Sequence, residues 1–201
     1  MADQVDSSAA GSGSPPRARV FVALKIAPEI ADQLAQMARE LQRFPVRLIA
    51  AADIHLTLVP PWNEPSIPDA VGKLHRVTDR FGDFVLEFRH AGYGPEPKRP
   101  RLLWAECAAG PELTQLRAML LQTFGQTDER PFRPHVTLVR LRGNGAAVAR
   151  KYPVDRDLAL TQRIGSVELM QSPSPGESGY KVLASLPLGK APEFPTGASG
   201  S

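Results

Sequence analysis

The chain has 201 residues and a formal net charge of +3 at pH 7, and 42% of its residues are hydrophobic, which is ordinary for a globular domain. The Lys and Arg residues are scattered, so the basic balance permits an anionic partner without requiring one. The single cysteine, Cys107, excludes an internal disulfide and a thiolate-rich zinc site, and it fits a reducing compartment.

Both ends of the chain are rich in Ser, Gly, Ala and Pro, so residues 1–17 and 190–201 are expected to be disordered tails. Residues 18–189 are expected to form one domain. No run approaches 18 apolar residues, and the N-terminus lacks the apolar core of a signal peptide, so we expect a cytoplasmic protein without a membrane partner. The absence of long exposed apolar runs favours a monomer.

The first half of the chain alternates strand and helix patterns. The expected elements are a strand at 19–26, a helix at 28–42, a short strand at 46–50, a strand at 54–59, a helix at 67–81 and a strand at 83–91. Pro60 and Pro61 are expected to end the strand at 54–59, because proline cannot donate to a strand ladder.

The second half repeats much of this order. It is expected to contain a strand at 101–107, a helix that follows Pro111, a strand at 131–141, a loop with at most one short helix at 143–157, and two strands at 164–172 and 180–188. Each half therefore has a helix followed by a strand that carries His-x-Thr, which indicates two similar lobes related by a pseudo-twofold axis.

The His-x-Thr strands read HLTLV from His55 and HVTLV from His135, and the copies are 135 − 55 = 80 residues apart. Side chains on a strand alternate between its two faces, so His55 and Thr57 share one face, as do His135 and Thr137. If the lobes face each other, two imidazoles and two hydroxyls line one groove.

This set of side chains suits phosphate ester chemistry. One neutral imidazole can accept a proton while a protonated one donates, and threonine hydroxyls can hold non-bridging phosphate oxygens. The chain offers no carboxylate cluster that would hold a metal convincingly, so we expect no metal and no cofactor. A single His-x-Thr is more often an ordinary surface feature of a strand, and it is the pair that favours catalysis.

The stretches that carry these motifs, ADIHLTLV and RPFRPHVTLVR, resemble those of the 2H phosphoesterases. Within that superfamily the chain is similar to the bacterial RNA 2′,3′-cyclic phosphodiesterases, or 2′-5′ RNA ligases (LigT-like). RVFVALKIAPEI, RPRLLWAEC and VELMQS…GESGYKVL extend the resemblance over residues 19–188. It implies an α+β, bilobal 2H phosphoesterase fold, with two antiparallel β-sheets flanking a central cleft and helices on the outside.

The resemblance also implies a function. It implies metal-independent hydrolysis of 2′,3′-cyclic phosphate ends of RNA, or of small cyclic nucleotides, to 2′-phosphomonoesters, with 2′-5′ RNA ligation as a side activity. His55 would be the proton donor and His135 the proton acceptor, and Thr57 and Thr137 would bind the phosphate. The chain departs from its relatives at VPPW (59–62), where they often carry Phe-Leu-Gly, and in the loop 142–157.

Several other residues are candidate substrate contacts with a structural alternative. Arg140 could reach a phosphate, although strict alternation turns it away from His135. Phe132 could stack on a base, and Tyr180 could line the cleft or only close the hairpin. Trp104 is expected in the core rather than on a base, and Arg101 and Arg133 either attract RNA or solvate the surface. His75 and His90 are expected on the surface and Cys107 in the core.

Two other functions stay open at this stage. The same cleft could bind a nucleotide or an RNA end without turnover, although a binding module does not need two titratable imidazoles. A different 2H reaction, such as opening an ADP-ribose cyclic phosphate or cutting 2′-5′ oligonucleotides, would use the same side chains.

Overall fold

The structure, a computed structural model, describes residues 18–174 and 177–189; the two predicted tails lie outside the described residues. The strands are β1 (Ala18–Lys25), β2 (Val46–Leu48), β3 (His55–Glu64), β4 (Phe84–Gly94), β5 (Leu102–Cys107), β6 (His135–Leu141), β7 (Asp155–Ile164), β8 (Ser166–Gln171) and β9 (Lys181–Pro187). The helices are α1 (Pro28–Ala38), α2 (Ile67–Thr78), α3 (Pro111–Thr123) and α4 (Gly145–Lys151), with 3₁₀ turns η1 (Arg39–Arg43) and η2 (Ala51–Asp53).

The strands pair in the order β7-β4-β5-β6-β3-β1-β8-β9, with β2 on β6, and these pairings are antiparallel. The α+β class with antiparallel strands is therefore confirmed. The two expected sheets are hydrogen-bonded into one, because β3 and β6 meet at the single residue pair Leu56 and Val136. This junction places the two His-x-Thr strands side by side.

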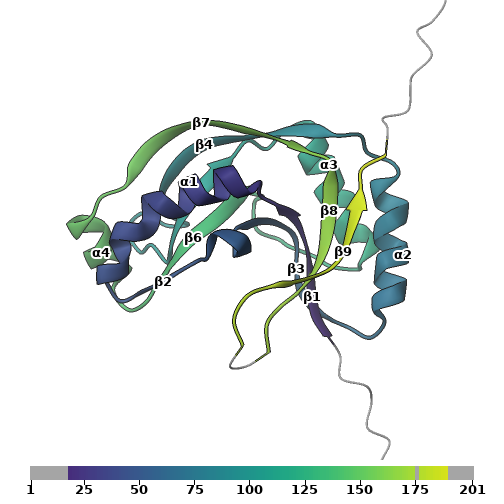
Figure 1. Cartoon of the computed structure of the whole chain (residues 1–201), viewed down its shortest axis with the longest axis horizontal. Coiled ribbons are helices and arrows are strands. Elements are labelled where there is room, and N and C mark those ends of the chain that lie inside the picture. Colours follow the sequence, from purple (N-terminus) through teal and green to yellow (C-terminus); the bar gives the residue numbers. More distant parts are fainter. Residues whose placement is uncertain (1–17, 175–176, 190–201) are drawn as a thin grey trace, which may run out of the picture.

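The helices tie the two halves together (Figure 1). α1 follows β1 in the chain but contacts β6, whereas α3 follows β5 and contacts β3. α2 packs on α3 and on β8 and β9. One continuous hydrophobic cluster extends from Val20 to Leu188 and includes buried residues of both halves. A side-chain amide adds a further link, because Gln162 of β7 accepts from the Ala27 amide and donates to the Lys25 carbonyl, both at 2.9 Å.

The prediction that Pro60 and Pro61 end their strand is wrong, because β3 continues to Glu64. The ladder with β1 is interrupted there: Val20 pairs with Trp62 and Val22 with Val59, which leaves both prolines unpaired. β6 contacts β3 only at Leu56, so no hydrogen bond from a proline nitrogen is needed on that side.

The sequence prediction also missed β7, whose first residues were assigned to a loop. Its first three residues, Asp155, Arg156 and Asp157, are charged and exposed, as expected for a strand at the edge of a sheet. β6 begins only at His135, because the preceding residues include Pro131 and Pro134 and run as a loop. The one short helix expected within 143–157 is α4. In the part of the chain that the structure describes, we find no helix with the length and apolar character of a membrane span.

Candidate active site

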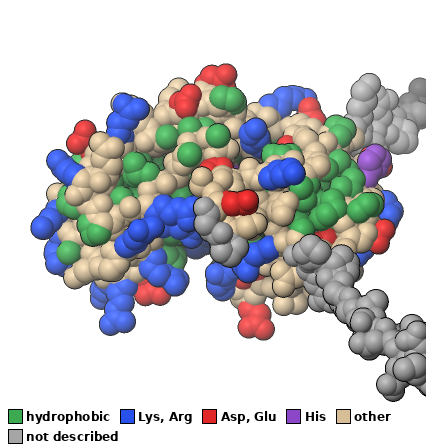
Figure 2. Space-filling view, turned by 60° about the horizontal axis from the view of Figure 1, so that its bottom comes forward, with side chains coloured by type: hydrophobic (Ala, Val, Ile, Leu, Met, Phe, Trp, Pro, Cys, Tyr) green, Lys and Arg blue, Asp and Glu red, His purple; other side chains and the backbone are tan. Residues whose placement is uncertain are grey.

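Both motif strands line one cavity of about 640 Å³. His55, Thr57, His135 and Thr137 all lie on its wall, as the alternation of the two strands predicts. The cavity is cationic: its wall also carries five arginines and three carboxylates, which are Arg101, Arg117, Arg130, Arg133 and Arg140 with Asp53, Glu96 and Asp128. Figure 2 shows Lys and Arg side chains gathered across the middle of the face that is turned forward.

Each motif strand contains a β-bulge at the same place. In β3 the partners of Val22 and Ala23 are Val59 and Thr57, so Leu58 is the extra residue. In β6 the partners of Leu103 and Trp104 are Val139 and Thr137, so the extra residue is Leu138. An extra residue shifts the alternation by one, and the side chains beyond it change face.

The bulge decides the position of Arg140. Strict alternation predicted that this side chain faces away from His135, and that prediction is wrong: Arg140 lines the same cavity as His135 and Thr137. The equivalent residue of the first copy is Pro60, since 140 − 80 = 60, and it lines the cavity too. The cavity therefore receives a guanidinium from one strand and an uncharged pyrrolidine ring from the other.

The His55 ring is held by its backbone neighbour and by two aromatic rings. Its Nδ1 lies 2.7 Å from the carbonyl oxygen of Asp53. Phe21 lies at 5.0 Å between ring centroids, and Tyr180 meets the imidazole edge-on at 4.9 Å. Tyr180 also lines the cavity, so the residue expected to line the cleft or close the hairpin does contact the site.

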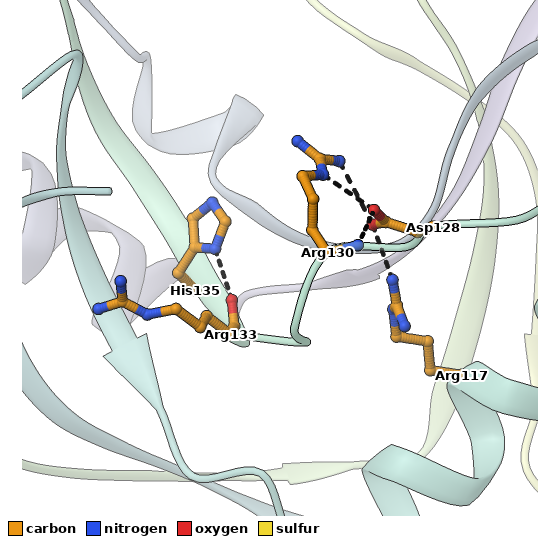
Figure 3. A network of polar contacts seen from close by, with 5 residues as sticks. All are labelled: Arg117, Asp128, Arg130, Arg133 and His135. Atoms are coloured by element: carbon orange, nitrogen blue, oxygen red, sulfur yellow. Dashed lines mark hydrogen bonds and ion pairs between the residues drawn. The ribbon is translucent and has the colours of Figure 1, made fainter. Parts of the chain in front are cut away.

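The His135 ring is held in the same way. Its Nδ1 lies 2.7 Å from the carbonyl oxygen of Arg133. Figure 3 draws this hydrogen bond as a dashed line. The Trp104 ring packs on the imidazole at 4.3 Å, and the Arg133 guanidinium lies 4.9 Å from the centre of the same indole. Trp104 lines the cavity but is only 3% exposed, so its main contacts are with the protein, as expected for a core residue.

These bonds fix the tautomer of both rings. A carbonyl oxygen only accepts, so each Nδ1 carries the proton and donates it. The Nε2 atom of each neutral ring is then left with a lone pair for chemistry in the cavity, and a protonated ring presents an Nε2–H there instead. The two histidines therefore offer the same proton-transfer atom.

The pKa of His55 and that of His135 are both below the usual histidine range. Burial is the main cause for each ring, since it penalises the charged form. The carbonyl bonds oppose that shift. The charge of Arg140, which lines the same cavity, lowers the pKa of both imidazoles. A bound anionic phosphate would raise both values again.

A polar network that sequence reasoning missed lies in the loop before β6 (Figure 3). Asp128 bonds Arg117 at 2.8 Å and the Arg130 side chain at 2.8 Å. The Arg117 guanidinium also covers one face of Phe132, at 4.4 Å from the ring centre. Phe132 lines the cavity, so this network holds the loop that presents the ring. Asp53 was missed as well, although its place two residues before His55 was a visible signal.

The remaining predicted residues lie where the sequence placed them. Arg101 and Arg133 line the cavity, and Cys107 is buried. His75 pairs with Asp79 on the surface of α2, and His90 pairs with Asp155; neither lines the cavity. Within residues 18–174 and 177–189 we find no group of three or more His, Cys, Asp or Glu side chains that could hold a metal ion.

Comparison with known proteins gives concordant results. Residues 49–172 match the model of the 2′-5′ RNA ligase superfamily. An RNA 2′,3′-cyclic phosphodiesterase of Aeropyrum pernix is 31% identical over 132 residues, which span 62% of this chain and 70% of that protein. One of Archaeoglobus fulgidus is 27% identical over 162 residues, spanning 73% of this chain and 91% of that protein. The fold matches E. coli LigT, solved with 3′-AMP, with a TM-score of 0.68 at 24% identity, over 86% of this chain and 98% of LigT.

Proposed function

Because the chain belongs to the 2′-5′ RNA ligase superfamily, we propose that it is an RNA 2′,3′-cyclic phosphodiesterase that opens cyclic phosphate ends to 2′-phosphomonoesters without a metal. One observation carries this proposal for the chain itself. Two histidines, each locked by an Nδ1–H bond to a carbonyl at 2.7 Å, line one cationic cavity beside two threonines. Such a pair can supply one acid and one base to the same phosphate.

The proposed reaction needs two proton transfers. The oxygen of a water molecule bonds to phosphorus while His135 Nε2 takes a proton from that water. The bond between phosphorus and O3′ breaks, and His55 Nε2 gives its proton to O3′. The product carries a 2′-phosphate and a 3′-hydroxyl. Exchange of one proton with solvent at each ring restores the starting state.

The cavity wall supports binding of the anionic phosphate. The hydroxyls of Thr57 and Thr137 are proposed to donate to its non-bridging oxygens, and Arg140 to neutralise the charge that develops on them. Neither hydroxyl nor guanidinium changes its protonation state during turnover. Their role is to hold the phosphorus between the two imidazoles.

The nucleoside has two candidate contacts. The Phe132 face opposite Arg117 is proposed to stack on a base, because one side of this ring is already covered by the guanidinium and the ring lines the cavity. Tyr180 is proposed to limit the space beside His55, since it lines the cavity and contacts that imidazole. With a 5′-hydroxyl of RNA as nucleophile in place of water, the same arrangement would form a 2′-5′ linkage, which we propose as a side activity.

The test is turnover of a short RNA that ends in a 2′,3′-cyclic phosphate, with EDTA present. Wild type should convert this RNA to a product with a 2′-phosphate end, whereas His55→Ala and His135→Ala should not. The product is identified by its mass and by its resistance to a 3′-specific phosphatase. His75→Ala is the matched control, because this imidazole lies on the surface of α2. Loss of wild-type activity in EDTA would refute the metal-free mechanism.

Retained binding of a 2′-nucleotide without any turnover would instead indicate the binding module that the sequence left open. Light scattering at several concentrations would test the predicted monomer. Fractionation of the source cells would test the predicted cytoplasmic location.

A further inference from the structure

The two catalytic rings are bound alike, but the residues that bind them carry opposite charges. Asp53 stands two residues before His55, and Arg133 stands two residues before His135, so they are equivalent by the 80-residue repeat. Each accepts the Nδ1–H of its histidine on the backbone carbonyl, at 2.7 Å in both cases. The backbone role is therefore shared, and the side chain is free to differ.

Asp53 is fixed beside its ring by a third segment of the chain. Its carboxylate accepts the backbone N–H of Tyr180 at 3.0 Å, and the Tyr180 ring packs edge-on against His55. The preceding residue, Gly179, has φ +85°, a backbone conformation that residues with a side chain rarely adopt. A side chain there would be strained, so the backbone needs glycine to bring Tyr180 onto Asp53.

Arg133 is fixed by three contacts on the other side. Its guanidinium lies over Trp104, donates to the Pro95 carbonyl at 3.2 Å and pairs with Glu106 at 2.6 Å. Glu106 is the cross-strand partner of His135, so it faces the same ring with the opposite charge. The bond to Arg133 offsets part of its influence.

Other charged groups also act on the two rings. Arg140 and the partner imidazole act on the site from the shared cavity, and Arg140 acts on both rings with the same sign. Lys25 pairs with His55 across β1 and β3, but it is exposed. Asp53 favours the protonated form of His55. For His135, Glu106 is the charged side chain that acts most strongly and favours the protonated form, and Arg133 opposes it. The residue two places before the histidine therefore acts with opposite sign on the two rings.

We propose that Asp53 and Arg133 are positioning residues whose side chains help to assign opposite roles to two histidines that are held by the same carbonyl bond. The carboxylate keeps His55 as the proton donor, and the guanidinium keeps His135 as the proton acceptor. This inference rests on the proposed two-histidine function, and it explains how a repeated motif performs an asymmetric reaction. The carbonyls hold the rings, and the side chains set which ring carries the proton.

The first test is the dependence of kcat/KM on pH. Asp53→Asn keeps an oxygen for the Tyr180 amide but removes the charge, so the alkaline limb should move to lower pH by about one unit while the acid limb moves less. Arg133→Gln should move the acid limb to higher pH. Asp32→Asn, on the exposed face of α1, is the control for net charge and should move neither limb.

The outcomes separate the alternatives. If Asp53→Asn moves the acid limb instead, the roles are reversed and the proposal is wrong. If Asp53→Asn leaves both limbs in place while Asp53→Ala lowers kcat/KM, the carboxylate only supports Tyr180, and the proposal is again wrong.

A second test does not need activity. The ring protons of His55 and His135, assigned by NMR from the two alanine variants, should titrate with His55 at the higher pH. Asp53→Asn should lower the His55 midpoint, and Arg133→Gln should raise that of His135. If wild type opens no cyclic phosphate, the proposed function fails, and these midpoints still support or refute the charge assignment.

Discussion

The two sides of the cavity share their geometry and differ in their charge. Each side has a His-x-Thr strand with a bulge after the threonine and an imidazole bound to the carbonyl two residues earlier. The differences lie at equivalent positions of the repeat: Pro60 corresponds to Arg140, and Asp53 corresponds to Arg133. A phosphate between two equal sides would have no preferred direction of attack. In the proposed mechanism, the shared features provide the proton transfer, and the features that differ provide its direction.

The largest effect is expected when either imidazole, the feature that both sides share, is removed. His55→Ala and His135→Ala should each lower kcat by about 10²- to 10⁴-fold, because acid and base act in one transition state. The double variant should lose little more than either single variant, since residues that act as a unit are not additive. Steady-state rates measure this, with circular dichroism as the control for folding. Two multiplicative losses would show that the rings act independently.

The residues inserted at the two bulges should contribute equally to the free energy of unfolding. Leu58 and Leu138 are each 1% exposed, so Leu58→Ala and Leu138→Ala should each cost about 2–5 kcal/mol in the free energy of unfolding. Urea titration measures both values, and Leu34→Ala in α1, also fully buried, gives a reference away from the bulges. A much smaller cost at one bulge would contradict the equivalence of the two strands.

Arg140 and Pro60, the residues at equivalent positions after the two bulges, should differ in their effect on turnover when they are replaced. Arg140→Ala should lower kcat/KM by about 10- to 100-fold, because a charge-assisted hydrogen bond is worth roughly 1.5–3 kcal/mol. Pro60→Ala should have almost no effect on turnover. Kinetics with cyclic phosphate RNA and competition by inorganic phosphate measure both. Equal effects at the two positions would mean that Arg140 does not contact the phosphate.

The smallest effect concerns stability against pH. The pKa of both buried imidazoles is lowered in the folded chain, mainly by burial, so the unfolded chain binds more protons near pH 6. The free energy of unfolding should therefore decrease as the pH falls from above 6.5 through the folded pKa values. Urea titrations in a buffer without phosphate would reveal this slope. This slope should become shallower in the double variant His55→Ala/His135→Ala. An unchanged slope would mean that other groups cause it.

Sequence reasoning located most of the strands, though not β7, and the four motif side chains, because alternation depends only on local backbone geometry. It failed where the ladder is irregular. Leu58 and Leu138 look like ordinary strand residues, and only the pairing register reveals that each is an insertion that turns Arg140 into the cavity. Pro60 and Pro61 were read as a stop for the same reason. The contact of Asp53 with Tyr180 joins residues 127 positions apart, which no local pattern records.

The exchange of helices between the halves bears on how the molecule folds. α1 contacts β6 and α3 contacts β3, so each motif strand needs a helix from the other half of the chain to complete its core. Neither half is then an independent folding unit, and the repeat cannot be separated into two autonomous modules. Such non-local contacts raise the entropic cost of loop closure before the native contacts form, so folding is expected to be slow and cooperative.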